Sequence, residues 1–353
     1  MFRTPPWTSI AHAALFTLAA APAIAAPLGY ERLVQPAAKS ITHMGVPVSN
    51  IIANNLNPDV FGTEGFRPVD VEIESHVDKI NYGDGYWGKV WQTISYVEVE
   101  NSGPLQEAGW VMTLEESLKV IEFYLESQNA RPIDIELYFR QEPDIDGDGT
   151  VIVPRHACIW VPNKGFHESA WDFIPPMPEA IFYNELQVKY DQGWRPYDVD
   201  FAVDFDGNIF GTALLAPIIS MDVLSGTQWM ATQWGWLTQT ELDAELAAGW
   251  QLLDFEKPVK GKADPLISNS KQWDIKPVKF YVLVHPLNPQ QFLDTHVEIL
   301  SGSEDFVHDT NQELSGEARL IDLETQYFKG SCGKNGICEG GSQYYEGAWL
   351  FPE

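Results

Sequence analysis

Three aspartates at alternating positions form the sharpest chemical feature of the sequence. Asp144, Asp146 and Asp148 take the first, third and fifth places of a short segment in which glycine is sixth and Thr150 seventh. Carboxylates at this spacing, with the backbone carbonyl of the seventh residue, supply the first half of a calcium-binding loop, and the glycine allows its tight turn. The segment therefore predicts a calcium site with these four residues as ligands.

The residues after Thr150 do not match the second half of such a calcium-binding loop. The twelfth place, where an EF-hand carries a bidentate acid, is occupied by Arg155, and residues 151–153 favour a strand rather than an exiting helix. Two interpretations stay open: a calcium-binding hairpin completed by another acid such as Glu142, or a plain acidic turn between two strands. Calcium is the one cofactor that the sequence suggests.

Other reactive side chains fit no catalytic template. One local cluster of titratable groups matches neither a metal site nor a catalytic triad; it comprises His156, His167, Glu168 and Asp172. Residues 268–271 match Ser-x-x-Lys, but the stretch is polar and has no helical pattern. The sequence has no Gly-x-Ser-x-Gly, no His-Glu-x-x-His and no phosphate-binding loop. We therefore predict no catalytic residue and favour a protein that is not an enzyme.

A short motif, Arg-Pro-x-Asp, recurs at equal spacing along the chain. Its arginines lie 64 residues apart twice (131 − 67 and 195 − 131), and a degraded fourth copy occupies residues 249–256. The three clear copies supply Arg67 and Asp70, Arg131 and Asp134, and Arg195 and Asp198. We interpret these residues as structural markers of a repeat, with each arginine in an ion pair to a neighbouring unit rather than in a ligand-binding ring.

The elements around each marker repeat as well. Apolar and acidic residues alternate after the Arg-Pro pair, which is typical of a strand, and Asp-Gly turns lead to second strands over residues 90–99, 156–161 and 209–215. A tryptophan-bearing loop and a helix follow; Thr113 with Glu116, and Thr238 with Glu241, form capping-box patterns. We predict an α+β fold of tandem strand–hairpin–strand–helix repeats, about 64 residues each, packed into one array or ring.

The ends of the chain differ from its middle. Residues 1–25 carry one charge and an apolar run ending in Ala-Ile-Ala, which predicts a cleaved signal peptide. Residues 26–60 are interpreted as an N-terminal extension or partial repeat. The repeat array then covers residues 61–290, with three clear units and one degraded unit, and residues 291–353 are interpreted as a C-terminal cap.

The cysteines agree with export. Cys332 and Cys338 flank a short glycine-containing loop that can close as a disulfide, as exported proteins commonly do. Cys158 lies in an apolar strand-like run and is expected to be a buried free thiol.

The charge excludes several classes of partner. A formal net charge of −28 repels nucleic acid and anionic lipid, and beyond the signal no stretch is apolar enough to span a membrane. The composition is 44% hydrophobic and 12% aromatic, which indicates an acidic surface on a real core. The partner is then an unknown extracellular protein or glycan.

The motif carries a resemblance to a known family. Gly-aromatic-Arg-Pro-x-Asp, followed by a tryptophan-bearing strand and a helix, resembles the tandem structural repeat of bacterial secreted proteins over residues 65–256. The same repeat forms the non-catalytic N-terminal region of polyglycine hydrolases, whose chemistry resides in a separate serine domain. The resemblance implies a repeat module without that catalytic partner.

These observations converge on two hypotheses. The first is a secreted repeat protein, extracellular or periplasmic, that acts as a binding or recognition module stabilised by calcium. The alternative is a secreted hydrolase whose active site is assembled between repeats, because the chain is rich in carboxylates. Two acids from different units, one with a raised pKa, would favour the second hypothesis.

Overall fold

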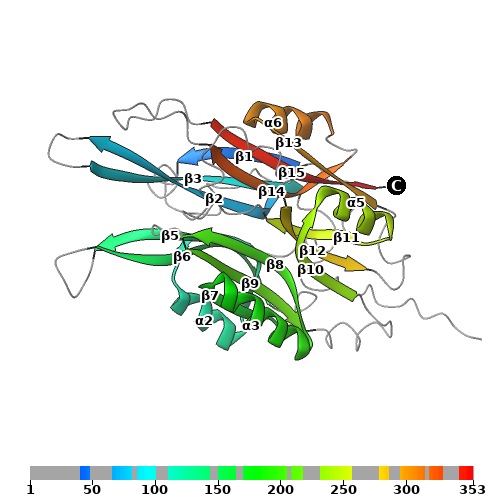
Figure 1. The fold of residues 1–353 in the computed structure, drawn as a ribbon, viewed down its shortest axis with the longest axis horizontal. Helices are drawn as coiled ribbons and strands as arrows, with labels where there is room; N and C mark the ends of the chain where they lie inside the picture. Colours follow the sequence, from blue (N-terminus) through cyan, green and yellow to red (C-terminus); the bar gives the residue numbers. More distant parts are fainter. Residues whose placement is uncertain are drawn as a thin grey trace, which may run out of the picture.

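A computed structural model describes residues 40–47, 66–81, 86–100, 110–143, 150–163, 170–204, 208–217, 231–256, 278–285, 295–314, 318–328 and 342–352. Within these residues the chain forms four helices and five three-stranded antiparallel sheets (Figure 1). The predicted α+β class is therefore confirmed.

All five sheets have the same strand order. In each, the last strand in sequence is central and the first two strands flank it. The first three sheets contain β1 (Ser40–Pro47), β2 (Phe66–Asn81) and β3 (Tyr86–Glu100); β4 (Val111–Glu116), β5 (Ala130–Pro143) and β6 (Thr150–Pro162); and β7 (Asp172–Pro178), β8 (Trp194–Val203) and β9 (Ile209–Pro217). The last two contain β10 (Ala231–Thr238), β11 (Gln251–Glu256) and β12 (Val278–His285), and β13 (Thr295–Gly302), β14 (Arg319–Phe328) and β15 (Ser342–Pro352).

A helix joins the first and second strands in four of the sheets. These helices are α2 (Leu118–Ser127), α3 (Glu179–Asp191), α5 (Gln239–Ala247) and α6 (Glu304–Glu313). Helices α2 and α3 are drawn in the lower part of Figure 1, and α6 at the top. Each of the four helices packs against strands of the sheets.

The sequence prediction lacks the first strand of the second, third and fourth sheets. The hairpins β2–β3, β5–β6 and β8–β9 match the predicted strand pairs, but β4, β7 and β10 occupy segments that we interpreted as tryptophan-bearing loops. Strand β7 contains three prolines, which lack the N–H that a central strand needs. An edge strand tolerates proline because one side makes no ladder bonds, and β7 lies at the edge of its sheet.

The repeated motif builds a β-bulge. The register of β2 against β3 shifts between Pro68 and Asp70, and β5 and β8 shift at the same place in their motifs. Strands β11 and β14 shift there too, although leucine replaces the proline. A bulge accommodates a residue without an N–H and re-aims the side chains that follow it. The aspartate after the bulge is therefore the constant feature.

The helix starts were predicted with mixed success. Thr238 and Glu241 form the predicted capping box of α5. Thr113 does not cap α2; it lies within β4, where its hydroxyl accepts a 3.0 Å hydrogen bond from Trp160 Nε1. Helix α2 instead begins after Ser117, which makes no side-chain capping bond. The capping prediction for the first helix is wrong because an extra strand precedes it.

The segment that we interpreted as a C-terminal cap contains the fifth sheet. The same segment contains α6, whose N-cap Ser303 accepts a hydrogen bond from the Phe306 N–H. Strand β14 follows the helix with a bulge before Asp322, as in the other sheets. At the other end, β1 lies within residues 26–60 and pairs with β3.

The largest core cluster forms where the helices cover the second, third and fourth sheets. Helix α3 contributes Phe182 and Leu186, both fully buried. Trp171 is buried in the same cluster, and Trp194 and Trp250 pack against it while partly exposed. The recurring tryptophans therefore act as core anchors, as their repeated positions predict.

Candidate functional site

Five strands, one from each sheet, contact one another from sheet to sheet. We call β2, β5, β8, β11 and β14 the inner strands. Each carries a buried aspartate directly after its bulge, and we call these the seam aspartates: Asp70, Asp134, Asp198, Asp254 and Asp322. Their side chains define the contacts between sheets.

Each seam aspartate accepts a backbone hydrogen bond from the neighbouring inner strand. The Val71 N–H donates to Asp134 at 2.8 Å, and the Ile135 N–H donates to Asp198 at 2.7 Å. The same bond joins the Val199 N–H to Asp254 at 2.8 Å, and the Phe255 N–H to Asp322 at 3.0 Å. The donor is always the residue after a seam aspartate, so every bond runs in the same direction.

A fifth bond joins the two ends of this series. The Leu323 N–H on β14 donates to Asp70 on β2 at 3.0 Å, although the residues are 253 positions apart in the sequence. The inner strands therefore contact one another in the closed series β2, β5, β8, β11, β14 and back to β2.

A second layer of carboxylates lies two residues beyond the seam aspartates. We call these the inner carboxylates: Glu72, Glu136, Asp200, Glu256 and Glu324. All five are buried, with between 3% and 9% of each residue exposed. Side chains on alternate positions of a strand point to the same face, so both layers lie on the face of the inner strands that meets the neighbouring sheets.

Two of the inner carboxylates accept backbone hydrogen bonds from a neighbouring inner strand. Glu136 accepts a hydrogen bond from the Ile73 N–H at 3.2 Å, and Asp200 accepts one from the Leu137 N–H.

Two of the inner carboxyl groups act on each other. Glu136 and Asp200 come from different sheets, and the charge of Asp200 raises the pKa of Glu136.

Burial and mutual repulsion shift the titration of the inner carboxylates. Burial raises the pKa of Asp200 from 3.8 to about 7, although its hydrogen bonds act in the opposite direction. Burial is also the largest cause that raises the pKa of Glu72, Glu136 and Glu256 above the usual 4.5, and nearby acids raise it further. Groups with such pKa values carry protons at a pH where free carboxylates do not.

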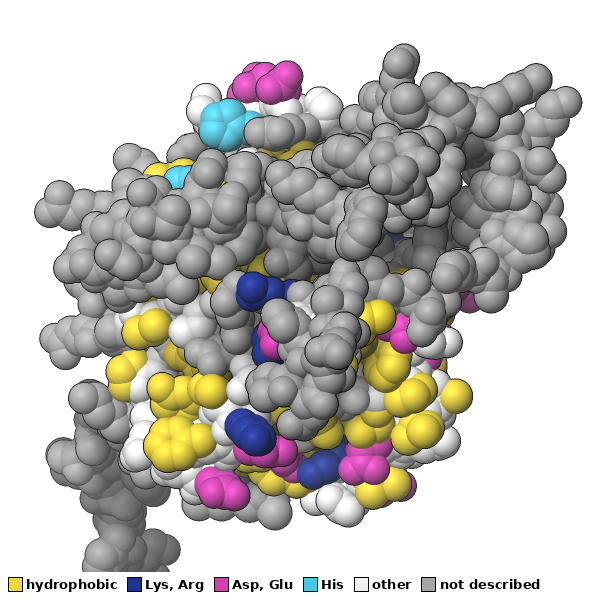
Figure 2. All heavy atoms as spheres, turned by 90° about the vertical axis from the view of Figure 1, so that its left-hand side faces the viewer, with side chains coloured by type: hydrophobic (Ala, Val, Ile, Leu, Met, Phe, Trp, Pro, Cys, Tyr) yellow, Lys and Arg dark blue, Asp and Glu magenta, His cyan; other side chains and the backbone are white. Residues whose placement is uncertain are grey.

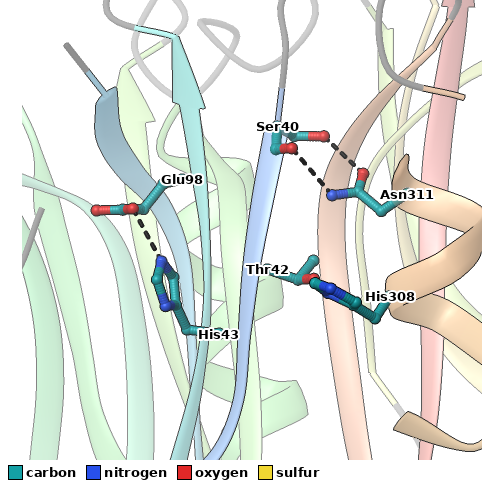
Figure 3. A network of polar contacts seen from close by, with 6 residues as sticks. All are labelled: Ser40, Thr42, His43, Glu98, His308 and Asn311. Atoms are coloured by element: carbon teal, nitrogen blue, oxygen red, sulfur yellow. Dashed lines mark hydrogen bonds and ion pairs between the residues drawn. The ribbon is translucent and has the colours of Figure 1, made fainter. Parts of the chain in front are cut away.

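A separate polar network joins the first and last sheets (Figure 3). The hydroxyl of Ser40 on β1 donates to Asn311 Oδ1 on α6 at 2.6 Å, and Asn311 Nδ2 donates to the Ser40 carbonyl at 3.1 Å. The hydroxyl oxygen of Thr42 lies 3.2 Å from Nδ1 of His308. These contacts hold β1 against α6.

A histidine–glutamate pair joins β1 to β3. His43 Nε2 is 3.0 Å from Glu98 Oε2, and the imidazole stacks on Tyr96 with 4.3 Å between ring centroids. The glutamate is buried and the histidine is one-third exposed. Figure 3 shows Ser40 and Thr42 directed away from this pair toward α6. The network therefore acts as a structural contact between the first and last sheets.

The predicted calcium segment falls mostly outside the described residues. Asp144, Asp146 and Asp148 lie outside them, and Thr150 is the first residue of β6, paired with Pro143. Within the described part, no group of three or more His, Cys, Asp or Glu side chains is placed to hold a metal ion.

The acid that we suggested as an additional calcium ligand has another partner. Glu142 receives two hydrogen bonds from the guanidinium of Arg155, at 2.6 and 2.8 Å. Glu142 would have to leave this bidentate pair to complete a calcium site.

The marker arginines have structural surroundings. Arg67 and Arg131 are buried. Arg195 donates to the backbone carbonyls of Tyr190 and Trp194, each at 2.8 Å, and its guanidinium lies 3.6 Å from the centre of the Tyr190 ring. Arg195 thus caps the C-terminal end of α3 instead of forming the ion pair that we expected.

The remaining candidates are described only in part. His156 is buried with its ring edge against Phe173, and Asp172 is paired with Lys189. His167 and Glu168 lie outside the described residues, as do Cys332 and Cys338. Cys158 is a buried free thiol, as predicted.

The inner carboxylates were not predicted as a site. The sequence shows acids alternating with β-branched residues after each motif, and we assigned these acids to a solvent-facing side of an amphipathic strand. The structure buries both faces, because one packs in the core and the other meets neighbouring inner strands. The sequence feature that could have indicated the inner carboxylates is the acidic residue two positions after each seam aspartate.

Comparisons with known proteins add no relative. No protein-family model, no curated protein and no solved structure matches the chain. No helix in the part that the structure describes is long and apolar enough to cross a membrane.

Proposed function

We propose that the protein is a secreted binding module, built as a closed ring of five repeat units of the Gly-aromatic-Arg-Pro family. The identical strand order of five sheets supports the repeat. The bond from Leu323 back to Asp70 supports closure. A ring without a free end between its units gives a rigid scaffold on which a ligand can be bound.

The observation that carries this proposal is the role of the repeated acids. Each seam aspartate is buried and accepts a backbone N–H, so the acids that mark the repeat stabilise it. A buried, bonded carboxylate is unavailable for attack on a substrate. The repeated positions therefore belong to the scaffold, and a ligand is contacted by residues that differ between units.

We favour exposed apolar side chains of α2 and α3 as the residues that contact the ligand. Phe123 on α2 is 62% exposed, and Ile181 and Val188 on α3 are exposed as well. Figure 2 shows hydrophobic side chains alternating with charged ones on the lower part of one face, the side on which α2 and α3 lie in Figure 1. Exposed aromatic rings among polar groups are typical of surfaces that bind glycans or peptides.

The test is a binding and hydrolysis screen of glycans, secreted polymers and peptides on the purified mature chain. For any ligand found, Phe123→Ser is expected to weaken binding by at least about tenfold, the effect of losing a contact of about 1.4 kcal/mol. Glu126→Ser, an exposed substitution on the same helix, is the matched control. Equal affinity of both variants and the wild type would exclude the α2 surface.

The alternative function is a hydrolase with its active site between units. The buried carboxyl groups of Glu136 and Asp200 favour it, because two acids from different units with raised pKa values suit acid–base chemistry. The same screen separates the two functions. Asp200→Asn abolishes turnover if the pair is catalytic, whereas a binding module keeps its affinity in that variant.

Calcium stabilisation remains part of the proposal and has its own test. We expect saturable terbium luminescence or calorimetric calcium binding by the mature chain, and loss of the signal in the Asp144→Asn/Asp146→Asn variant. Because Arg155 holds Glu142, the Glu142→Gln variant should bind about as tightly as the wild type. Titration without saturation up to millimolar calcium would identify residues 144–150 as a plain acidic turn.

A further inference from the structure

We propose that the solvent-facing side of α6 is a docking site for a lysine or arginine side chain of a cationic peptide segment. Its residues are Phe306, Asp309 and Glu313, which we call the α6 stripe. They are three and four positions apart, so they lie on one side of the helix. The α6 stripe is a different surface from the one proposed above, because α2 and α3 are drawn in the lower part of Figure 1 and α6 at the top.

The opposite side of α6 is occupied by the rest of the protein. Val307 and Asn311 are buried, and Figure 3 shows Asn311 and His308 directed at β1. Asp309 is two residues from both Val307 and Asn311, a rotation of about 200° around the helix axis. The α6 stripe therefore faces solvent, and Asp309 and Glu313 are exposed.

The aromatic ring of the stripe is seated on a glycine. Phe306 is 45% exposed although it is a large apolar side chain. Its ring lies over Gly302 at the end of β13, where a Cβ atom would come within 2.6 Å of the ring carbon Cγ. Gly302 is not among the described glycines with a positive φ, so the ring contact is what requires a glycine here. The exposed part of a ring held in this way attracts an ammonium or guanidinium group.

The acids of the stripe are not explained by the helix itself. Asp309 and Glu313 are four residues apart, a spacing at which like charges repel. Glu313 also lies in the last turn, where the helix dipole favours a cation. Asp305 differs, because the dipole favours an acid in the first turn. Within the described residues, neither Asp309 nor Glu313 makes a hydrogen bond or an ion pair.

The described elements around the stripe supply no lysine or arginine. Helix α6 packs against β1, β13 and β15, and none of these four elements contains either residue. The one histidine of α6, His308, has its two ring nitrogens in contact with Thr42 and Gln312. Figure 2 shows acidic side chains gathered at the top of the molecule, where Figure 1 draws α6.

These charges select the occupant. A lysine or arginine side chain that covers the Phe306 ring brings its charge to Asp309 and Glu313, and a neutral or anionic partner leaves both acids uncompensated. The net charge of −28 attracts such a cationic segment from a distance. On α2 the exposed Phe123 is in a different setting, because Lys119 lies one helical turn before it.

The experiment measures the affinity of the full mature chain for labelled hexalysine at low salt, by fluorescence anisotropy. The test variant is Phe306→Leu, which keeps the net charge and an apolar contact with Gly302 but removes the aromatic ring. We expect the Kd to rise at least about threefold, as for the loss of a cation–π contact at an exposed site. The matched control is Phe123→Leu on α2, which should bind hexalysine as the wild type does.

A second pair of variants tests the acids. Asp309→Asn/Glu313→Gln and Glu122→Gln/Glu126→Gln remove the same charge from exposed positions of α6 and α2. We expect the first to weaken hexalysine binding at least about threefold more than the second. In the wild type, the ring current of Phe306 should shift the ε-methylene protons of bound hexalysine upfield, and this NMR shift should be absent in Phe306→Leu.

Two outcomes would overturn the proposal. Equal hexalysine affinity of Phe306→Leu and Phe123→Leu would mean that the peptide is held only by general attraction to an acidic surface. Equal affinity of the wild type for hexalysine and for its fully acetylated form, whose side chains carry no charge, would mean that the contact is apolar. Neither result would affect the ligand surface proposed for α2, because that surface is tested by Phe123→Ser with other ligands.

Discussion

Asp70→Ala is expected to destabilise the chain as strongly as Asp198→Ala, by about 3 kcal/mol, the cost of leaving a buried N–H without its charged acceptor. Asp198 receives its hydrogen bond from a residue 63 positions away, whereas the donor to Asp70 is 253 positions away. In an open array Asp70 would lie at a free edge, and its replacement by alanine would lower the free energy of unfolding only slightly. Equal losses of stability in the two alanine variants would therefore indicate a closed ring.

Urea unfolding of both variants, followed by tryptophan fluorescence, measures this comparison. Asp70→Asn and Asp198→Asn are the controls, because the amide oxygen can still accept the N–H, and both should lose less stability than the alanine variants. Asp309→Ala, at a helix position outside the seams, should stay within about 0.5 kcal/mol of the wild type. An Asp70→Ala variant as stable as the wild type would contradict closure.

Phe182→Ala is expected to cost more, about 3–5 kcal/mol, which is typical of a fully buried aromatic side chain. Phe182 lies on the buried face of α3 and meets the ring of Phe201 edge-on, with 5.4 Å between centroids. Its ring also lies over Gly211, where even a Cβ atom would come within 2.7 Å of it. Truncation therefore opens a cavity in the largest core cluster.

The adjacent residue supplies the control for that measurement. Ile181 is the preceding residue of α3 but is more than half exposed, so Ile181→Ala should change stability by about 0.5 kcal/mol or less. Thermal or urea unfolding of the two variants gives the comparison. Similar losses for both would mean that α3 does not pack by the face that contains Phe182.

The sequence carried enough information for the class of the fold. The alternation after each Arg-Pro pair predicted β2, β5 and β8, and the Asp-Gly turns predicted their hairpin partners β3, β6 and β9. Both signals are local, because they depend on residues adjacent in the chain. The bulge was not predicted, since proline marks it in three copies and leucine stands in its place in the other two.

The edge strands and the carboxylate layers could not be predicted in the same way. Strand β7 has too many prolines to read as a strand, and only its pairing with β9 makes it one. Glu72, Glu136 and Asp200 have the pattern of solvent-facing acids, and their burial depends on strands about 63 residues away. The pairing of β7 and the burial of these acids depend on tertiary packing, which outweighs the local sequence pattern.

The one-way direction of the seam bonds has a consequence for how the chain could be rearranged. Each sheet offers an aspartate to the preceding sheet and an N–H to the following one, as in a head-to-tail ring of subunits. In the closed ring that we propose, all five junctions use the same chemistry, including the one between the first and last sheets. A mature chain circularly permuted between any two sheets is then expected to form the same set of seams.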